Sequence, residues 1–396
     1  MLPKSRLALL ALVAAAAPVA AKEKVFVGEN FFLWDVYGYP DTQSWENAYY
    51  NCFNAVSAAD VDGTIWSLDG DGRYSFVHLR THNLQVLQPL PGDEADGVDV
   101  AAHGGDALVA YSDGTIVRID GVKKTFEGAL HVGASVSAMT TSGDLVAVGS
   151  PDGTLRLGNA QTGDFVEVAK LGGAISSLHE LGGVLYAGTP TGTIARIELA
   201  TKQPLAPFTV ANDAQTIAEY QGLLLVGGTD KTIERIAPAT GELVDTLLRD
   251  FPVLALASFD DPTWIDHHVV THSSSLATGV DHDLAISTGP ELVGDYYMVV
   301  GSFTYAWTED FQVVLDGVEI PLQPDAYTLF TLSSGVSSVI SNARGIIPAG
   351  GMAAAKFHTA PGQVTQWFSA FHSIVTLDLA TGTVSGSSTW RQVWGV

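Results

Sequence analysis

Asp113-Gly114-Thr115-Ile116, Asp152-Gly153-Thr154-Leu155, Thr191-Gly192-Thr193-Ile194 and Asp230-Lys231-Thr232-Ile233 are similar tetrapeptides that begin 39 residues apart. The same step relates two further columns, one of glycines (Gly149, Gly188, Gly227) and one of apolar residues (Val100, Met139, Leu178, Ile217, Leu256). A fixed period of this size is typical of repeat architectures. Because three columns agree on it, we expect each unit to have the same structure.

Four short strands are expected within one unit. Residues 184–188 and 193–197 are rich in β-forming side chains and flank Thr191-Gly192, and glycine tolerates the positive φ that a tight hairpin requires. Residues 174–178 and 205–210 supply the outer pair. Four antiparallel strands in about 40 residues are typical of a β-propeller blade.

The number of blades depends on the two ends of the repeat region. A further turn, Asp62-Gly63-Thr64-Ile65, precedes Asp113 by one period plus an insertion, and residues 253–257 match an inner strand with no turn after them. We expect these incomplete units to close one blade together, which gives five blades over residues 22–262. Residues 22–50 form either a sixth blade or a cap on the ring.

The N-terminus has the pattern of a signal peptide. Lys4 and Arg6 precede an uncharged run from Leu7 to Ala17, and small residues end at Ala21. The run is shorter than the roughly 20 apolar residues that span a bilayer. We therefore expect cleavage of residues 1–21 and a protein that is secreted, either extracellular, at the cell surface or periplasmic, with no membrane span in the mature chain.

Charge and cysteine content argue against a nucleic-acid-binding protein and against a protein stabilised by internal disulfides. The formal net charge is −24, whereas nucleic-acid binding requires a basic face. Cys52 is the only cysteine, so no disulfide forms within the chain. Such an acidic surface is kept in solution by self-repulsion and suits a saline medium.

A second all-β domain is expected over residues 263–396, where the 39-residue register stops. Residues 296–302, 327–332 and 371–377 have strand-like composition, and Pro and Gly punctuate the region. A β-sandwich-like domain is the default for strands of this kind.

Two clusters are candidate metal sites, for calcium or a transition metal. Asp266, His268 and His272 combine carboxylate and imidazole groups of the kind that bind zinc or copper. The alternative is an interdomain linker with solvated histidines. Four aspartates crowd the first repeat and suggest calcium, with ordinary turn acids as the alternative: Asp60, Asp62, Asp69 and Asp71.

A column of arginines follows three of the turns, at Arg118, Arg196 and Arg235. These cations either ring one surface and bind an anion, or offset the acidic charge of the chain while solvated. The second interpretation is favoured.

The repeats over about residues 50–260 resemble the quinoprotein-like and WD-repeat-like β-propeller superfamily. The matching features are the Asp-Gly-Thr-Ile turn, the arginine column and the Thr-Gly at Thr162-Gly163 and Thr240-Gly241. Tryptophan docking motifs of members that bind pyrroloquinoline quinone are missing, as is the Trp-Asp dipeptide within the repeat frame. The resemblance implies a fold and no particular activity.

Residues 275–385 resemble an uncharacterised C-terminal module of secreted proteins of planctomycetes and other environmental bacteria. The resemblance rests on Asp281-His282-Asp283, Gly294 to Ser302, Ile320-Pro321-Leu322 with Asp325-Ala326-Tyr327, and Phe371-His372. It implies an exported accessory module.

Three functional hypotheses follow. The first is a non-enzymatic binding or scaffold protein whose propeller recognises a protein or glycan on or outside the cell. The second is an enzyme, either a quinoprotein-like oxidoreductase or a metal-dependent lyase or hydrolase. The third is a structural component of an envelope layer. No catalytic motif stands out, which favours the first, while fold alone does not decide function.

Overall fold

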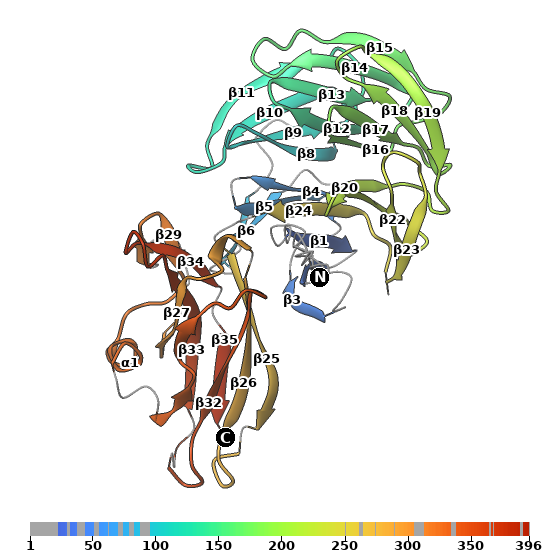
Figure 1. Cartoon of the computed structure of the whole chain (residues 1–396). Coiled ribbons are helices and arrows are strands. Elements are labelled where there is room, and N and C mark those ends of the chain that lie inside the picture. The colour runs from blue at the N-terminus through green and yellow to red at the C-terminus, as the bar shows by residue number, and fades with distance from the viewer. Residues whose placement is uncertain are drawn as a thin grey trace, which may run out of the picture.

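The structure is a computed structural model of the chain (Figure 1). It describes residues 23–29, 32–37, 44–50, 55–61, 63–69, 74–78, 83–87, 96–249, 251–260, 264–273, 275–288, 290–304, 313–333, 338–363, 366, 368–388 and 391–395. The predicted signal peptide lies outside these residues, as do Cys52, Asp62 and Asp71. No helix in the described ranges is long and apolar enough to cross a membrane.

Described residues from 23 to 260 form six four-stranded antiparallel sheets. Sheet 1 contains β4 (Ala55–Val61), β5 (Thr64–Asp69), β6 (Tyr74–His78) and β7 (Asn83–Leu87). Sheet 2 contains β8 (Gly97–His103), β9 (Asp106–Tyr111), β10 (Thr115–Asp120) and β11 (Phe126–His131). Sheet 3 contains β12 (Ala138–Ser142), β13 (Leu145–Gly149), β14 (Thr154–Asn159) and β15 (Val166–Lys170).

The remaining three sheets continue the series. Sheet 4 contains β16 (Ser177–Leu181), β17 (Val184–Gly188), β18 (Thr193–Glu198) and β19 (Gln203–Thr209). Sheet 5 contains β20 (Thr216–Tyr220), β21 (Leu223–Gly227), β22 (Thr232–Ile236) and β23 (Leu243–Leu248). Sheet 6 joins β24 (Ala255–Asp260) to β1 (Glu23–Glu29), β2 (Phe32–Tyr37) and β3 (Ser44–Tyr50).

The first strands of the six sheets contact one another in a closed ring. The order is β24, β4, β8, β12, β16 and β20, and β20 contacts β24 again. Apolar clusters fill the spaces between neighbouring sheets. Met139 of sheet 3, for example, packs with Leu108 and Ile116 of sheet 2. Each sheet therefore buries its faces against its neighbours around a common axis.

The closure of this ring differs from the expectation from sequence. Residues 253–257 were expected to complete the unit that contains Asp62, but β24 pairs with β1, with Phe26 opposite Ala257. The physical reason is that β4 already supplies the inner strand of sheet 1, while Val25, Phe26 and Val27 are fully buried and need a partner. The described residues between 23 and 50 thus contribute three strands to sheet 6, whose inner strand is β24.

The repeated turns explain why the tetrapeptides recur at a constant spacing along the chain. Gly153 has φ +82°, and a Cβ added there would lie 2.5 Å from the carbonyl oxygen of Gly173. The carboxylate of Asp152 accepts the backbone N–H of Thr154 at 2.9 Å, and Asp113 does the same for Thr115 at 2.8 Å. Glycine supplies both the backbone conformation and the space, and aspartate stabilises the turn.

Residues 264–395 form a second β unit. Its nine-stranded sheet has the order β30 (Ile340–Ser341), β32 (Met352–His358), β26 (Asp281–Thr288), β25 (Trp264–Ser273), β34 (Val384–Ser388), β33 (Phe368–Leu377), β27 (Tyr296–Ser302) and β31 (Arg344–Ile346), with β35 (Arg391–Gly395) paired to β33. A hairpin of β28 (Val313–Leu315) and β29 (Val318–Ile320) and a short 3-10 turn, η1 (Pro290–Leu292), complete it.

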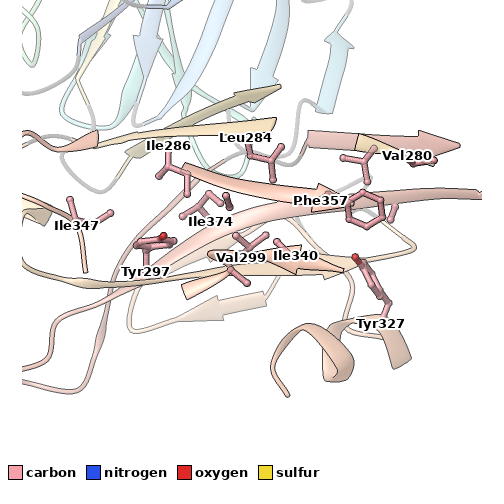
Figure 2. Packing of buried hydrophobic residues seen from close by; sticks show 14 of the residues in the cluster. Val280, Leu284, Ile286, Tyr297, Val299, Tyr327, Ile340, Ile347, Phe357 and Ile374 are labelled. Atoms are coloured by element: carbon pink, nitrogen blue, oxygen red, sulfur yellow. The ribbon is translucent and has the colours of Figure 1, made fainter. Parts of the chain in front are cut away.

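The main apolar core of this unit is formed by side chains from strands of the nine-stranded sheet, with Tyr327 of the segment 326–331. Figure 2 shows Leu284 and Ile286 of β26 on one side and Val299 of β27 on the other, with Ile374 of β33 between them. The expected strands at residues 296–302 and 371–377 are present as β27 and part of β33. The two-layer sandwich remains a prediction.

One expected strand is a helix instead. Residues 327–332 were predicted to form a strand, but Ala326–Thr331 is the helix α1. Asp325 accepts the backbone N–H groups of Tyr327 and Thr328, and the Thr328 side chain accepts the N–H of Asp325 in return. This reciprocal cap stabilises the first helical turn against the β propensity of the segment.

Candidate functional site

A central cavity of about 320 Å³ lies at the axis of the ring. Its walls come from the inner strands of all six sheets, β4, β8, β12, β16, β20 and β24, with the residues that precede them. A neighbouring hollow of about 360 Å³ shares Val56, Val98, Ser176 and Gln215 with it. The two hollows therefore adjoin along the axis.

The cavity lining is acidic. Among the described residues that line it, three carry carboxylates, Asp60, Asp99 and Glu180, one is a histidine, His179, and none is Lys or Arg. The rest of the described lining consists largely of small or hydroxyl side chains, and it contains no Phe, Tyr or Trp. This lining favours cations and disfavours anions.

Asp99 connects two sheets at the cavity wall. Its carboxylate accepts the backbone N–H of Met139 in sheet 3 at 2.6 Å and that of Val100 at 2.9 Å, and the hydroxyl of Ser57 in sheet 1 also donates to it. Burial raises the pKa of Asp99 to about 6, and these three hydrogen bonds oppose the rise. Protein atoms surround the carboxyl, although the residue keeps partial contact with solvent beside the cavity.

The same contact recurs at two other junctions. The backbone N–H of Val100 is donated to the Ser57 hydroxyl at 3.2 Å, and that of Leu256 to the Thr216 hydroxyl at 3.0 Å. An inner strand has no partner strand on the axial side, so a side chain of the preceding sheet accepts one of its N–H groups. These bonds align Ser57 of β4 with the repeat column that contains Asp99 and Thr216.

Asp60 and Glu180 occupy one layer of the cavity. Asp60 lies three residues after Ser57, and Glu180 lies three residues after Ser177, which is in the same repeat column as Asp99. Each also accepts the N–H of a turn glycine, Gly63 at 3.0 Å and Gly183 at 2.7 Å. Since β4 and β16 are three places apart in a ring of six strands, the two acids stand on opposite walls.

His179 is the one imidazole in the described lining. Its Nε2 is buried and has no hydrogen-bond partner, while the residue as a whole is half-buried beside the cavity. Burial lowers the pKa of His179 to about 4. The ring is therefore neutral near pH 7 and adds no positive charge to the lining.

The arginine column is engaged in the fold. Arg196 of sheet 4 donates to the carbonyl oxygens of Pro238 and Ala239 in sheet 5, at 3.0 and 2.8 Å. Arg118 of sheet 2 likewise reaches the Gln161 side chain of sheet 3 at 3.4 Å. These two members of the column therefore tie neighbouring sheets together at the loops that carry the repeated Thr-Gly.

Arg235, the third member of the column, bonds within its own sheet. It is buried, and its guanidinium forms a two-point contact with the Asp245 carboxylate, with the Nε to Oδ1 distance at 2.8 Å. This paired geometry leaves the cation neutralised inside the protein.

The predicted transition-metal ligands fall on one strand. Asp266, His268 and His272 belong to β25, where His268 is opposite Ala285 and His272 is opposite His282. A register shift between Val269 and Thr271 separates the two histidines. Their side chains lie outside the described residues, so this metal site stays a prediction.

The predicted calcium site is only partly described. Asp60 bonds Gly63 in the first turn, as an ordinary turn acid does. Asp69 ends β5, whereas Asp62 and Asp71 lie outside the described residues. In the part of the chain that is described, no three His, Cys, Asp or Glu side chains are grouped so as to hold a metal ion.

The C-terminal motif residues converge on one buried network. The hydroxyl of Tyr327 on α1 lies 2.8 Å from Nε2 of His372 on β33, and both are buried. Gly301 on β27 leaves room for that tyrosine, because a Cβ there would lie 2.5 Å from Cε1 of Tyr327. The neighbouring Ser302 hydroxyl donates to Asp325 at 3.0 Å. These motif residues thus have a packing role.

Sequence reasoning missed the residues that define the cavity. Asp99, His179 and Glu180 each interrupt a repeat column whose other members are mostly small or hydroxyl residues, such as Ala101 and Thr140 in the column of His179. An ionisable residue in a column of small or hydroxyl residues was the signal in the sequence. In a ring of repeats, such a residue on an inner strand changes the charge at the central axis.

Comparison with known proteins gives a likeness of shape. No protein family and no curated protein matches the chain. A crystal structure of a nidogen/laminin complex is similar with a TM-score of 0.51 and 10% identity, over 60% of this chain and 98% of that chain. A crystal structure of the computationally designed Ika8 protein gives 0.42 and 18%, over 60% and 75%. The first likeness supports the all-β fold with small antiparallel sheets, and no more.

Proposed function

We propose that this chain is a six-bladed β-propeller followed by a β-sandwich-like domain, and that it is an exported binding or scaffold protein. The closed order of the six inner strands and the 39-residue period support the propeller. The signal-peptide pattern of residues 1–21 supports a location outside the cytoplasm. The partner is a protein or glycan on or outside the cell.

The observation that carries the binding role is the outer edge of sheet 5. On β23, Leu243, Val244 and Leu248 are 51%, 51% and 81% exposed. The only charged residue of β23, Asp245, is paired with Arg235. An apolar strand at the end of a sheet is a template for pairing with another chain.

The outer strands of sheets 3 and 4 are protected by contrast. β19 contains Pro204 and Pro207, and β15 contains Glu167 and Lys170. Prolines and charges on an edge strand discourage pairing with another chain. β23 has no proline, and its one charge is paired with Arg235. It therefore offers backbone hydrogen bonds and apolar side chains to an extended segment of a partner. This argument favours a protein over a glycan.

Binding of the labelled mature protein to washed cell-surface material tests the proposal. The double variant Val244→Lys with Leu248→Lys places two charges on the edge, and it should bind at least about tenfold more weakly. Val166→Lys is the matched control, because Val166 occupies the equivalent position two repeats earlier and is 53% exposed. It should bind like the wild type.

Treatment of the surface material separates the two classes of partner. Loss of binding after protease treatment identifies a protein, and loss after periodate oxidation identifies a glycan. The proposal is wrong if the wild-type protein binds neither untreated nor treated material, or if Val166→Lys weakens binding as much as the β23 variant does.

The alternative function of a quinoprotein-like oxidoreductase has less support from the residues that line the cavity. Pyrroloquinoline quinone is a tricarboxylate, and its binding calls for cationic groups. The described lining offers Asp60, Asp99 and Glu180 and no Lys or Arg. These residues do not fit that cofactor, and we derive no oxidoreductase step through it.

A further inference from the structure

We propose that a cavity on sheet 3 binds the carboxylate group of a small organic acid, held by the guanidinium of Arg156 and the hydroxyl of Ser150. The inference rests on a comparison of the same place in two repeats. It concerns sheet 3 and is independent of the β23 edge of sheet 5.

The cavity has a volume of about 280 Å³ and lies beside the segment that connects β11 of sheet 2 to β12 of sheet 3. Its described lining contains one cation, Arg156, which is half-buried on β14. Guanidinium and hydroxyl groups are donors that a carboxylate accepts. The lining residues are Ala134, Ser135, Ser150, Pro151, Asp152 and Arg156.

Sheet 5 has a carboxylate of its own at the equivalent place. Glu234 lies two repeats after Arg156, and it is buried. Its carboxylate accepts the backbone N–H of Ala211 at 3.1 Å. Burial raises the pKa of Glu234, and the N–H groups of Ala211 and Asn212 oppose the rise. This place in a repeat can therefore hold a carboxylate.

The connecting segments before the two sheets begin with the same hydrogen bond. The N–H of Val132 is donated to the carbonyl oxygen of Gly114 at 2.9 Å. Two repeats later, the N–H of Val210 is donated to that of Gly192 at 2.8 Å. Gly133 then takes φ +74°, so the backbone of the first segment follows its own course. The side chains of sheet 3, and not its backbone, are therefore the expected contacts of a ligand.

Larger polar side chains occupy the same space in sheet 5. A Cβ added at Gly228 of that sheet would lie 2.5 Å from Oδ1 of Asp213 and 2.8 Å from Cβ of Asn212. An alanine and a serine stand two repeats earlier, at Ala134 and Ser135. Sheet 3 thus lacks both the internal carboxylates and the bulk that close this place in sheet 5.

The charge of Arg156 is not neutralised within the described part of the chain. No described carboxylate forms an ion pair with it, and Glu167, which is opposite Arg156 on β15, is exposed. Asp152 also lines the cavity, but its Oδ2 lies 2.6 Å from Nζ of Lys170. Arg156 is therefore available to an anion from solution.

Ser150 supplies a second donor. The residue is 3% exposed, and its hydroxyl oxygen accepts Nη1 of Arg156 at 3.0 Å. In the described contacts, that hydroxyl donates to no protein atom, and a ligand carboxylate beside Arg156 would accept it. Because the net charge of −24 repels anions at long range, these two short-range contacts must supply the binding.

Titration of the full mature chain with butanoate, followed by the NMR signals of backbone amides and arginine side chains, tests the inference. We expect saturable shifts centred on residues 133–135 and 150–156. Butanamide, the uncharged analogue, should cause none. Inorganic phosphate is the second anion, and it should bind more weakly than butanoate.

Two variants remove the cation in different ways. Arg156→Gln should weaken butanoate binding at least about tenfold, because the charge-assisted hydrogen bonds are lost. Arg156→Glu gives sheet 3 the internal carboxylate that sheet 5 already has, and it should abolish binding. Thermal unfolding of both variants checks that the ring is intact.

Lys202→Gln is the matched control for the loss of one positive charge. Lys202 is exposed in the hairpin between β18 and β19 of sheet 4, and the variant should bind butanoate like the wild type. Glu167→Gln removes the acid opposite Arg156, and it should bind at least as tightly as the wild type.

Several outcomes would overturn the inference. They are the absence of saturable shifts in the folded wild type, equal binding of butanamide, tighter binding of phosphate, an equal loss of affinity in Lys202→Gln, or binding that appears only in Glu167→Gln. The last result would identify Glu167 as the internal partner of Arg156. None of them depends on whether β23 binds a macromolecule.

Discussion

Asp99 on β8 accepts the backbone N–H of Met139 on β12 at 2.6 Å, so that a carboxyl group of sheet 2 satisfies the inner strand of sheet 3. Among the contacts of the described residues, it is one of three in which a side chain accepts a backbone N–H of the next sheet's inner strand. It is the only one of the three made by an ionisable group. Stability of the ring should therefore depend on pH through this residue.

The first prediction concerns Asp99→Asn. The folded pKa of about 6 exceeds the ordinary value of 3.8, so the folded chain binds this proton more tightly than the unfolded chain does. In the wild type, this group lowers the free energy of unfolding as pH rises from about 4 to about 6. Asparagine does not titrate, so the variant lacks this contribution to the pH dependence of the free energy of unfolding. The difference in stability, variant minus wild type, should therefore increase by at most about 3 kcal/mol between pH 4 and pH 7.

Native-state hydrogen exchange of β8 and β12 at several pH values measures this difference. Ser57→Ala serves as a control, since it removes a neighbouring donor without removing a titrating group. Parallel pH profiles for wild type and Asp99→Asn would show that the carboxyl titrates normally in the folded ring.

The repeat made most of the ring predictable, because each unit carries its own turn signal. Gly114, Gly153 and Gly192 all take positive φ at the predicted turns. Sheet 6 was not predictable in this way. Its pairing of Phe26 with Ala257 joins residues far apart in sequence, and the sequence of residues 23–50 has no tetrapeptide like Asp-Gly-Thr-Ile. Non-local pairing leaves no local pattern.

The misassigned helix has a different cause. Residues 327–332 are rich in aromatic and β-branched side chains, which favour a strand. The cap formed by Asp325 and Thr328 overrides that preference. An Asp followed three residues later by Thr was a visible signal for a helix start, and it was outweighed by composition. The candidate site was harder still, because its acids come from sheets that only the closed ring brings face to face.

The second prediction concerns Gly149, a member of the glycine column. It lies on β13, and a Cβ added there would stand 2.5 Å from Cγ2 of Ile175 in the approach to sheet 4. Gly149→Ala should overpack this junction and destabilise the ring by about 1 to 3 kcal/mol. A drop in the thermal midpoint measures the effect.

Gly128→Ala is the matched control for this variant. Gly128 lies on the outer strand β11, and no atom stands within 4 Å of an added Cβ. Alanine there should leave the midpoint unchanged or raise it slightly, since it reduces the freedom of the unfolded chain. An equal loss in both variants would mean that backbone freedom, and not the junction with Ile175, is limiting.

The third prediction concerns Arg196, which links sheets 4 and 5. Lysine cannot reproduce the contacts of Nη1 with Pro238 and Ala239 while also matching the Nε contact with Ala206 at 2.8 Å. Arg196→Lys should therefore speed hydrogen exchange in residues 237–241. Arg156→Lys is the control, because Arg156 bonds only Ser150 of its own repeat in the described contacts. Equal exchange in both variants would contradict a link between the sheets.

The fourth prediction concerns His372 in the C-terminal unit. Burial, with a smaller contribution from the charge of His282, lowers the pKa of His372 to about 3. The unfolded chain takes up this proton near pH 6.5, whereas the folded chain does not. The free energy of unfolding should therefore fall as pH drops below 6.5, by about 2 kcal/mol at pH 5 from this residue. Hydrogen exchange of the β33 amides at several pH values measures this loss of stability.

The double variant His372→Phe with Tyr327→Phe tests that assignment, because it removes the titrating ring and the hydroxyl that would otherwise lose its partner. The acid sensitivity of β33 should decrease, while the ring of six sheets keeps its own pH profile. His358→Gln, on β32 of the same unit but not fully buried, should leave the acid sensitivity in place. If the double variant is as acid-sensitive as the wild type, the buried His282 or another group, and not His372, controls acid unfolding of this unit.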